Sequence, residues 1–180
     1  PASGPVLVTG ATGGVGSVAV KLLAQLGYEV VAVTGKEDKH DFLRSLGASE
    51  ILSREEANAG SDKPMLAERW GGVVDTVGGD ILFNGVKSLR YGCSLAACGL
   101  VAAPVFSASV LPFILRHVNL LGIDSVQLPI EEKTEIWHRL GDEWLMDLSE
   151  LEEVLTLDDV SDAIDRILAG KMVGRGVVHL

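Results

Sequence analysis

Short runs of β-branched residues alternate along this chain with longer segments in which apolar residues recur every three or four positions. Runs of the first kind are typical of buried strands, and segments of the second kind are typical of amphipathic helices. Their alternation indicates a parallel sheet with helices on both faces. We therefore predict an α/β fold with a doubly wound, six-stranded parallel sheet, with strands near residues 6–9, 29–34, 50–52, 73–76, 93–97 and 118–123.

The first predicted helix follows the first strand directly. Its apolar residues recur at steps of three and four: Val15, Val18, Ala19, Leu22, Leu23 and Leu26. Gly27 is placed to end this helix, because glycine readily adopts the left-handed conformation found at helix C-termini. For the next helix we predict that Asp38 is the N-terminal cap and that Gly47 is the terminating glycine.

The pattern changes after Gln127-Leu128-Pro129. An amphipathic helix around residues 136–145, a short strand near 154–157, a helix over 160–168 and a closing strand over 176–180 follow. These elements do not extend a doubly wound sheet in any simple way. We therefore divide the chain into a domain of residues 1–128 and a C-terminal returning segment, residues 129–180, that belongs to a neighbouring domain.

Charge and composition exclude several classes of protein. The formal net charge is −10, and ten acids but no Lys or Arg lie between Gly141 and Asp165, which argues against a nucleic-acid partner. No apolar run approaches the roughly 20 residues that cross a bilayer, and the first residues do not resemble a signal sequence. Cys93 and Cys98 would point to opposite faces of a strand and could not form a disulfide. We predict a cytoplasmic protein that does not enter the membrane.

A glycine-rich turn, residues 8–16 (Val-Thr-Gly-Ala-Thr-Gly-Gly-Val-Gly), lies between the first predicted strand and the first helix. In that position, glycines permit a tight turn, let backbone N–H groups approach a pyrophosphate, and let the helix pack closely. The pattern predicts a Rossmann domain that binds a dinucleotide. The residues that we expect to bind its phosphates are Gly10, Thr12, Gly13, Gly14 and Val15.

The end of the second predicted strand favours NADPH over NADH. A carboxylate there would accept the ribose hydroxyls of NAD, but the chain has Thr34-Gly35-Lys36 and no acid before Glu37. If the third strand lies beside the second, Arg54 comes to the same rim. Lys36 and Arg54 could then bind the 2′-phosphate, with the hydroxyl of Thr34 as a neutral donor. The alternative is that both cations are ordinary surface residues paired with Glu37 and Asp38.

The glycine spacing is also similar to that of short-chain dehydrogenases, whose catalysis needs a Tyr followed four residues later by a Lys. Tyr28 and Tyr91 are followed at that offset by Ala32 and Leu95, so that chemistry is missing here. The histidines at 40, 117, 138 and 179 lack the spacing of metal ligands, and no Cys-x-x-Cys occurs. We therefore predict no metal site.

Further short motifs accompany the glycine-rich turn, at residues 33–36, 45–48, 75–78, 97–100, 112–116 and 122–125. Together these motifs give the chain a resemblance to the cofactor domain of medium-chain dehydrogenases/reductases. Within that superfamily it is similar to the zinc-free quinone oxidoreductase branch, and above all to NADPH-dependent acryloyl-CoA reductases. The resemblance extends to residues 174–178, where members return to their catalytic domain. It implies that Leu100 and Ser125 lie near the nicotinamide. Arg175 could approach the cofactor too, although a solvated arginine is the expected alternative.

The resemblance also implies a missing N-terminal half that holds the substrate pocket and the proton donor. We therefore assign no catalytic residue to this chain and expect the isolated chain to be inactive. The expected activity of the parent protein is hydride transfer to an activated alkene, such as an acryloyl-CoA-like enoyl thioester or a quinone. Two alternatives stay open: half of an NAD(P)-dependent alcohol dehydrogenase, and a dinucleotide-binding or interaction module without turnover. The apolar sixth strand predicts a homodimer through that edge.

Overall fold

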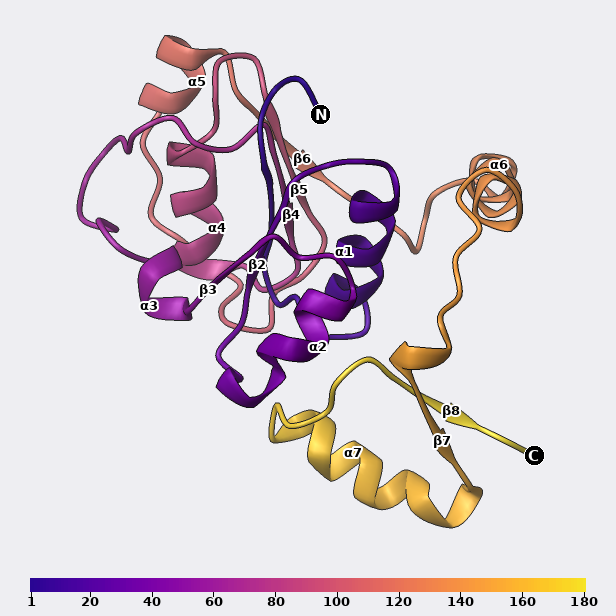
Figure 1. The fold of residues 1–180 in the computed structure, drawn as a ribbon. Coiled ribbons are helices and arrows are strands. Elements are labelled where there is room, and N and C mark those ends of the chain that lie inside the picture. The colour runs from indigo at the N-terminus through magenta and orange to yellow at the C-terminus, as the bar shows by residue number, and fades with distance from the viewer.

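Six parallel strands form the main sheet of the structure, a computed structural model that describes residues 1–180 (Figure 1). The strand order is β3-β2-β1-β4-β5-β6, which is the doubly wound order and confirms the predicted fold class. All six predicted strands are present, with ends that differ by a residue or so. The strands are β1 (Val6–Val8), β2 (Val30–Val33), β3 (Glu50–Leu52), β4 (Gly72–Asp75), β5 (Ser94–Ala97) and β6 (Asn119–Gly122).

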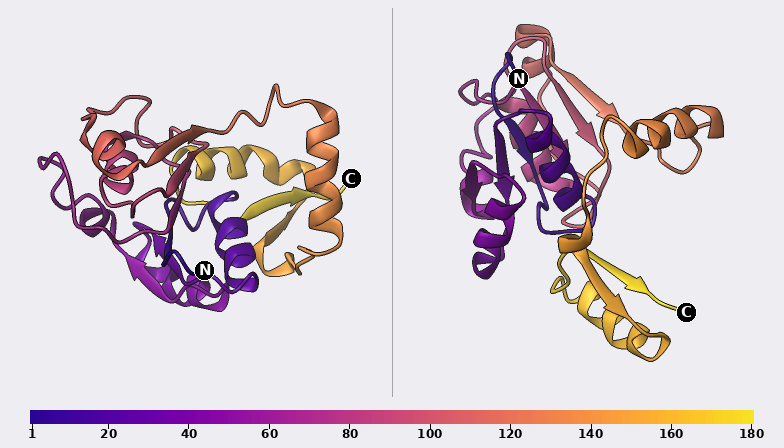
Figure 2. Two further views of the ribbon diagram at one scale, coloured as in Figure 1. Left: turned by 90° about the horizontal axis from the view of Figure 1, so that it is seen from above. Right: turned by 45° about the vertical axis from the view of Figure 1, so that its right-hand side comes forward.

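Helices cover both faces of this sheet (Figure 2). On one face, α4 (Gly79–Lys87) packs through Leu82, Phe83 and Val86 into a core that includes strand residues of β1, β2, β4 and β5. On the other, α1 (Gly16–Gln25) and α2 (His40–Ser45) enclose a second core. The shorter helices α3 (Arg54–Ala57) and α5 (Leu111–Arg116) follow β3 and precede β6. The strands β1 and β2 are thus buried from both sides, as their unbroken apolar runs predict.

The C-terminal segment forms a separate small unit. Its parallel strands β7 (Glu152–Leu155) and β8 (Arg175–Val178) pair only with each other, and α7 (Val160–Leu168) connects them. Helix α6 (Ile130–Gly141) precedes them and stands clear of the main sheet in both figures. It ends before Trp144, so the predicted helix over 136–145 is too long at its C-terminal end. The division at residues 128 and 129 remains a prediction.

The prediction that Asp38 caps a helix is wrong. Residues Glu37–Lys39 form a 3-10 turn, and α2 begins only at His40, without a side-chain cap. The Asp38 carboxylate instead pairs with Lys39 at 2.9 Å. Gly27 and Gly47 follow the helices as predicted, both with positive φ angles. No helix of the structure is long and apolar enough to span a membrane, and both cysteines are free.

A buried carboxylate joins the carboxyl ends of β1 and β4. Asp75 is 0% exposed, and its two oxygens accept hydrogen bonds from Thr9 Oγ1 at 2.7 Å and from the Gly78 N–H at 2.8 Å. Thr9 Oγ1 also accepts a hydrogen bond from the Thr76 N–H. Burial raises the pKa of the Asp75 carboxyl, although the hydrogen bonds from Thr9, Gly78 and Val77 oppose this. The network fixes the glycine-rich turn after β1 relative to the turn after β4.

The substitution Asp75→Ala should lower the free energy of unfolding by about 3 kcal/mol at neutral pH, because it leaves several buried donors without an acceptor. Urea unfolding followed by circular dichroism measures this. Asp165→Ala, at an exposed position on α7, is the control and should change stability by less than about 0.5 kcal/mol.

The stability difference between wild type and Asp75→Ala should depend on pH in a defined direction. The folded protein holds the Asp75 proton more tightly than the unfolded chain, in which the carboxyl keeps a pKa near 3.8. As the pH rises above 3.8, the unfolded chain therefore loses this proton first, and the stability contributed by Asp75 declines. The stability difference between wild type and Asp75→Ala should shrink with rising pH. A difference that grows would contradict the proposed cause.

The glycine-rich turn leaves no room for a side chain at Gly16. A Cβ atom there would overlap the Gly10 carbonyl oxygen and lie 2.8 Å from Ala11 Cα. At Gly13, the nearest atom to such a Cβ is the Gly10 carbonyl oxygen, at 3.3 Å. The Ser17 hydroxyl donates to the Gly13 carbonyl at 2.8 Å and ties the turn to α1. Gly16 is therefore required by the backbone of the turn itself.

We expect Gly16→Ala to destabilise the protein by about 1–3 kcal/mol, since backbone atoms must move to admit the methyl group. Gly13→Ala, the matched change three residues earlier, should cost less than about 1 kcal/mol, because only a small adjustment is needed. Thermal unfolding of the two variants side by side distinguishes them. Equal losses would show that the close approach at Gly16 is relieved elsewhere.

Candidate cofactor-binding site

A cavity of about 320 Å³ opens where the carboxyl ends of β1, β2 and β4 meet. In doubly wound sheets, ligands bind in the crevice at this edge, where the strand order reverses. The lining residues come from the turn after β1 (Thr9, Gly10, Thr12), the ends of β2 and β3 (Val33, Thr34, Gly35, Arg54), the region after β4 (Val77, Ile81), the loop after β5 (Val101, Ala102) and the end of α7 (Leu168, Ala169, Gly170).

Five of the residues predicted from the sequence line this cavity: Gly10, Thr12, Thr34, Gly35 and Arg54. Gly13, Gly14 and Val15 continue the same turn, and α1 begins immediately after them. The N–H groups in the first turn of a helix are free to bind an anion. The structure therefore brings the predicted phosphate-binding turn and the predicted ribose rim to one crevice.

Arg54 lies across the end of β2, as the predicted strand order requires. β2 pairs with β3, and the Arg54 side chain packs so closely on Gly35 that a Cβ there would lie 2.7 Å from Arg54 Nε. Arg54 is the first residue of α3, whose N-terminus is capped by Ser53 and Glu56. The absence of a side chain at Gly35 thus lets the guanidinium reach the rim of the cavity.

The Lys36 side chain makes a contact that the sequence did not predict. Its ammonium donates a hydrogen bond of 2.5 Å to the carbonyl oxygen of Met172, in the C-terminal segment. Burial lowers the pKa of Lys36, and the positive charges of Arg54 and Lys39 lower it further, whereas the Asp38 carboxylate opposes the shift without forming an ion pair. Neither Lys36 nor Arg54 forms an ion pair, so the predicted alternative, pairing with Glu37 or Asp38, does not occur. Two close cations without a carboxylate partner are suited to bind an anion.

The Thr34 hydroxyl sits deeper than expected. The side chain is 5% exposed, its oxygen accepts a hydrogen bond from the Lys36 N–H at 3.1 Å, and it lies 3.5 Å from Thr12 Oγ1. The hydroxyl therefore shapes the turn after β2, and its proton stays available for Thr12 or a ligand.

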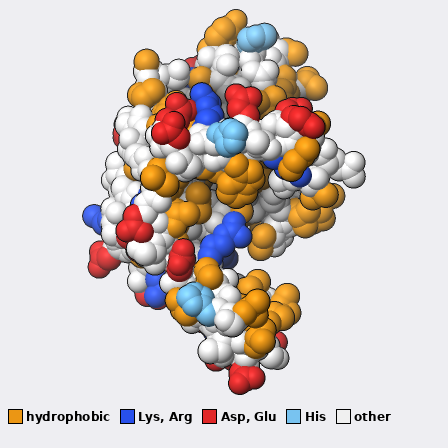
Figure 3. Space-filling model, turned by 90° about the vertical axis from the view of Figure 1, so that its right-hand side faces the viewer, with side chains coloured by type: hydrophobic (Ala, Val, Ile, Leu, Met, Phe, Trp, Pro, Cys, Tyr) orange, Lys and Arg blue, Asp and Glu red, His pale blue; other side chains and the backbone are white.

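Arg175 is exposed to solvent, as expected for a solvated arginine, and it also lies against the phosphate-binding turn. Its side chain is close enough to Gly14 that a Cβ there would lie 3.0 Å from Arg175 Nε. The preceding residue, Gly174, donates its N–H to the Thr12 carbonyl at 3.0 Å. Figure 3 shows Lys and Arg side chains in the hollow between the main domain and the C-terminal unit.

The residues expected near the nicotinamide are less well tied to the site. Leu100 is 66% exposed and does not line the cavity, although its neighbours Val101 and Ala102 do. Ser125 lies in an exposed turn after β6, and no contact brings it to the crevice. Cys98 is exposed, and its thiol donates weakly to the Asp75 carbonyl at 3.3 Å.

Nine of the 14 lining residues were not predicted as site residues, and most of them lie after β4, after β5 and at the end of α7. Val77 and Ile81 follow β4, and the rule that ligands lie at the carboxyl ends of strands could have indicated them. The end of α7, residues 168–170, gave no local signal, because its place in the cavity depends on how the C-terminal unit packs. No three side chains of His, Cys, Asp or Glu come together in a way that could hold a metal ion.

Comparisons with known proteins agree with this geometry. The family model for zinc-binding dehydrogenases matches residues 14–141, although the residues present do not form a zinc site. An acrylyl-CoA reductase of Ruegeria pomeroyi is 48% identical over the whole of this chain, which covers 55% of that protein. A probable acrylyl-CoA reductase of Escherichia coli is 40% identical with the same coverage. The chain thus spans about half the length of these relatives.

Solved structures show the same similarity. The yhdH oxidoreductase of Salmonella enterica in complex with NADP superimposes with a TM-score of 0.93 at 41% identity, and the chain covers 55% of it. The yhfP protein of Bacillus subtilis with NAD bound gives a TM-score of 0.95 at 42% identity, again over 55% of its length. The corresponding B. subtilis sequence is named a putative quinone oxidoreductase. The chain therefore belongs to the zinc-binding dehydrogenase family, among relatives named as acrylyl-CoA reductases and quinone oxidoreductases.

Proposed function

We propose that this chain is the NADPH-binding half of an oxidoreductase that transfers a hydride to an activated alkene. The observation that carries the proposal is the pair of cations at the end of β2, Lys36 and Arg54, which have no carboxylate partner. A carboxylate at this place would accept the ribose hydroxyls of NAD, whereas two cations suit the 2′-phosphate of NADP. The relative from S. enterica was solved in complex with NADP.

The residues of this chain would hold the dinucleotide along one line. The glycine-rich turn and the N-terminus of α1 would bind the pyrophosphate through backbone N–H groups, with the Arg175 guanidinium above Gly14 as a charged donor. Arg54 and Lys36 would bind the 2′-phosphate. Val77, Ile81 and Leu168 give the cavity apolar walls that can enclose the adenine.

When bound, NADPH would supply the hydride. The names of the relatives support an enoyl thioester such as acryloyl-CoA, or a quinone, as the acceptor. We propose that an additional N-terminal half of the parent protein holds the substrate and donates the proton, because relatives are nearly twice as long as this chain. Exposed apolar residues on the C-terminal unit, Val154, Leu157 and Ile164, offer it a contact surface. The free thiols of Cys93 and Cys98 suit a reducing cytoplasm.

Calorimetric titration with NADPH and NADH tests the cofactor assignment. The wild type should bind NADPH more tightly, and Lys36→Ala or Arg54→Ala should weaken NADPH binding by about ten- to a hundredfold, the value of one charge-assisted hydrogen bond. Binding of NADH should hardly change, because NADH lacks the 2′-phosphate.

The matched control for this titration is Lys133→Ala, which removes a cation on α6, away from the main sheet. It should leave the preference for NADPH intact. The relative from B. subtilis was solved with NAD bound, so equal affinities for the two cofactors are a real alternative. That result in the wild type, or equal losses of both cofactors in the variants, would refute the assignment.

We also propose that the protein forms a homodimer through β6. This strand is one edge of the main sheet, and Leu121 and Ile123 beside its free edge are 49% and 51% exposed. The N–H groups of Asn119 and Ile123 donate to β5, so those of Leu120 and Gly122 point outward. An apolar edge with free backbone donors can pair with the same edge of a second copy.

Leu121→Lys should convert this dimer to a monomer at micromolar concentration, because two-fold symmetry would bring like charges close together in an apolar contact. Sedimentation equilibrium gives the mass directly. Val105→Lys changes an equally apolar, 74% exposed residue away from β6 and should leave the dimer intact. A wild type that sediments as a monomer would rule out this interface.

A further inference from the structure

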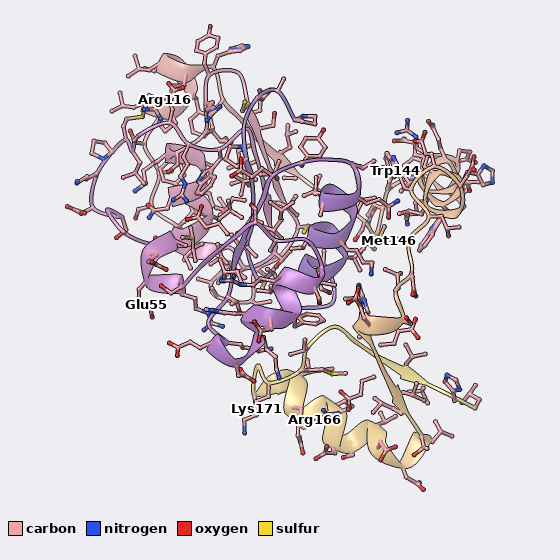
Figure 4. The ribbon with its side chains drawn as sticks, in the orientation of Figure 1. Glu55, Arg116, Trp144, Met146, Arg166 and Lys171 are labelled. Atoms are coloured by element: carbon pink, nitrogen blue, oxygen red, sulfur yellow. The ribbon has the colours of Figure 1, made fainter.

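Residues 168–175 connect α7 to β8, and we call this segment the C-terminal strap. Its first residues, Leu168, Ala169 and Gly170, line the cavity. Two hydrogen bonds fasten its other end to the main domain: Lys36 Nζ to the Met172 carbonyl at 2.5 Å, and the Gly174 N–H to the Thr12 carbonyl at 3.0 Å. Figure 4 labels Lys171, an exposed residue of the strap near the end of α7.

Lys36 is the only charged side chain in these two fastening contacts. It is half-buried, it lies near Arg54, and no acid forms an ion pair with either cation. An ammonium has three N–H groups, and the Met172 carbonyl takes one of them. The remaining donors can therefore bind a second acceptor without releasing the strap.

Electrostatic interactions link the two acceptors that Lys36 can contact, the Met172 carbonyl and a bound phosphate. Burial and the charge of Arg54 disfavour a protonated Lys36 in this position, although the nearby Asp38 carboxylate opposes this effect. A phosphate beside Arg54 and Lys36 would reverse this, because it attracts both cations and favours the charged ammonium. The hydrogen bond from Lys36 to the Met172 carbonyl would become stronger as a result.

We propose that Lys36 is a positioning residue that couples the 2′-phosphate of the cofactor to the seating of the C-terminal strap. This rests on the proposed NADPH site and adds a second role to the same ammonium. Any dinucleotide can contact the strap through Leu168, Ala169 and Gly170, but only one with a 2′-phosphate acts through Lys36. NADPH thus holds the strap, and with it the start of β8, more firmly than NADH does.

Hydrogen exchange of the Gly174 amide is a direct readout, because this N–H is bonded to Thr12 when the strap is seated. It should be measured by NMR on the 180-residue chain, free and saturated with each cofactor. We expect exchange about tenfold slower with NADPH than with NADH, as the gain of one charge-assisted hydrogen bond would give. Trypsin cleavage after Lys171 should slow in the same order.

Three variants separate the possible causes. Lys36→Met keeps the length of the side chain without its charge and should abolish the difference between the cofactors, whereas Lys36→Arg should retain it. Lys133→Met removes a cation on α6, which stands clear of the main sheet, and should behave as wild type. A difference that persists in Lys36→Met would overturn the coupling.

The experiment also distinguishes this inference from the function on which it rests. If saturated wild type shows the same Gly174 exchange with both cofactors, while titration still shows a preference for NADPH that depends on Lys36, the coupling is wrong and the cofactor assignment stands. If the two cofactors bind with equal affinity, the assignment itself fails. Slower exchange with NADPH, lost in Lys36→Met, supports both.

Discussion

A carboxylate without access to solvent persists in a protein only where hydrogen bonds replace the water that it has lost. Asp75 is in this position, and the donors that satisfy it come from the end of β1 and from the turn after β4. Both segments contribute lining residues to the cofactor cavity, Thr9 from the first and Val77 from the second. The polar contact thus fixes these two parts of the lining relative to each other, and the apolar cores on either face of the sheet hold the strands in place around it.

Much of the fold could be predicted because its signals are local. Short, mostly apolar runs marked all six strands, and the glycine-rich turn marked where the first strand meets its helix. The prediction that Asp38 caps the helix was wrong because Asp38 lies within a 3-10 turn, and α2 begins only after that turn. The positions of Lys36 and Arg175 depend on contacts with residues that are distant in sequence. Lys36 bonds to a backbone carbonyl, an acceptor that every residue has, so no residue type could indicate it.

The cofactor site combines parts with different tolerance for change. Backbone groups of the glycine-rich turn would bind the pyrophosphate, so their geometry is set by the absence of side chains at a few positions. The 2′-phosphate would instead be bound by the side chains of Lys36 and Arg54. Related enzymes could therefore exchange one cofactor for the other by changing the ends of β2 and β3, while the turn stays the same. Structures of relatives with NADP and with NAD are consistent with such a division.

The two fastening contacts of the strap use backbone atoms of the strap itself, the Met172 carbonyl and the Gly174 N–H. Substitution at 172 leaves its carbonyl in place, so many residue types can stand there. At Gly174 the φ angle is +62°, and a Cβ would overlap the Leu151 carbonyl oxygen. Although only one residue separates them, position 172 should therefore vary freely during evolution, whereas position 174 should remain glycine.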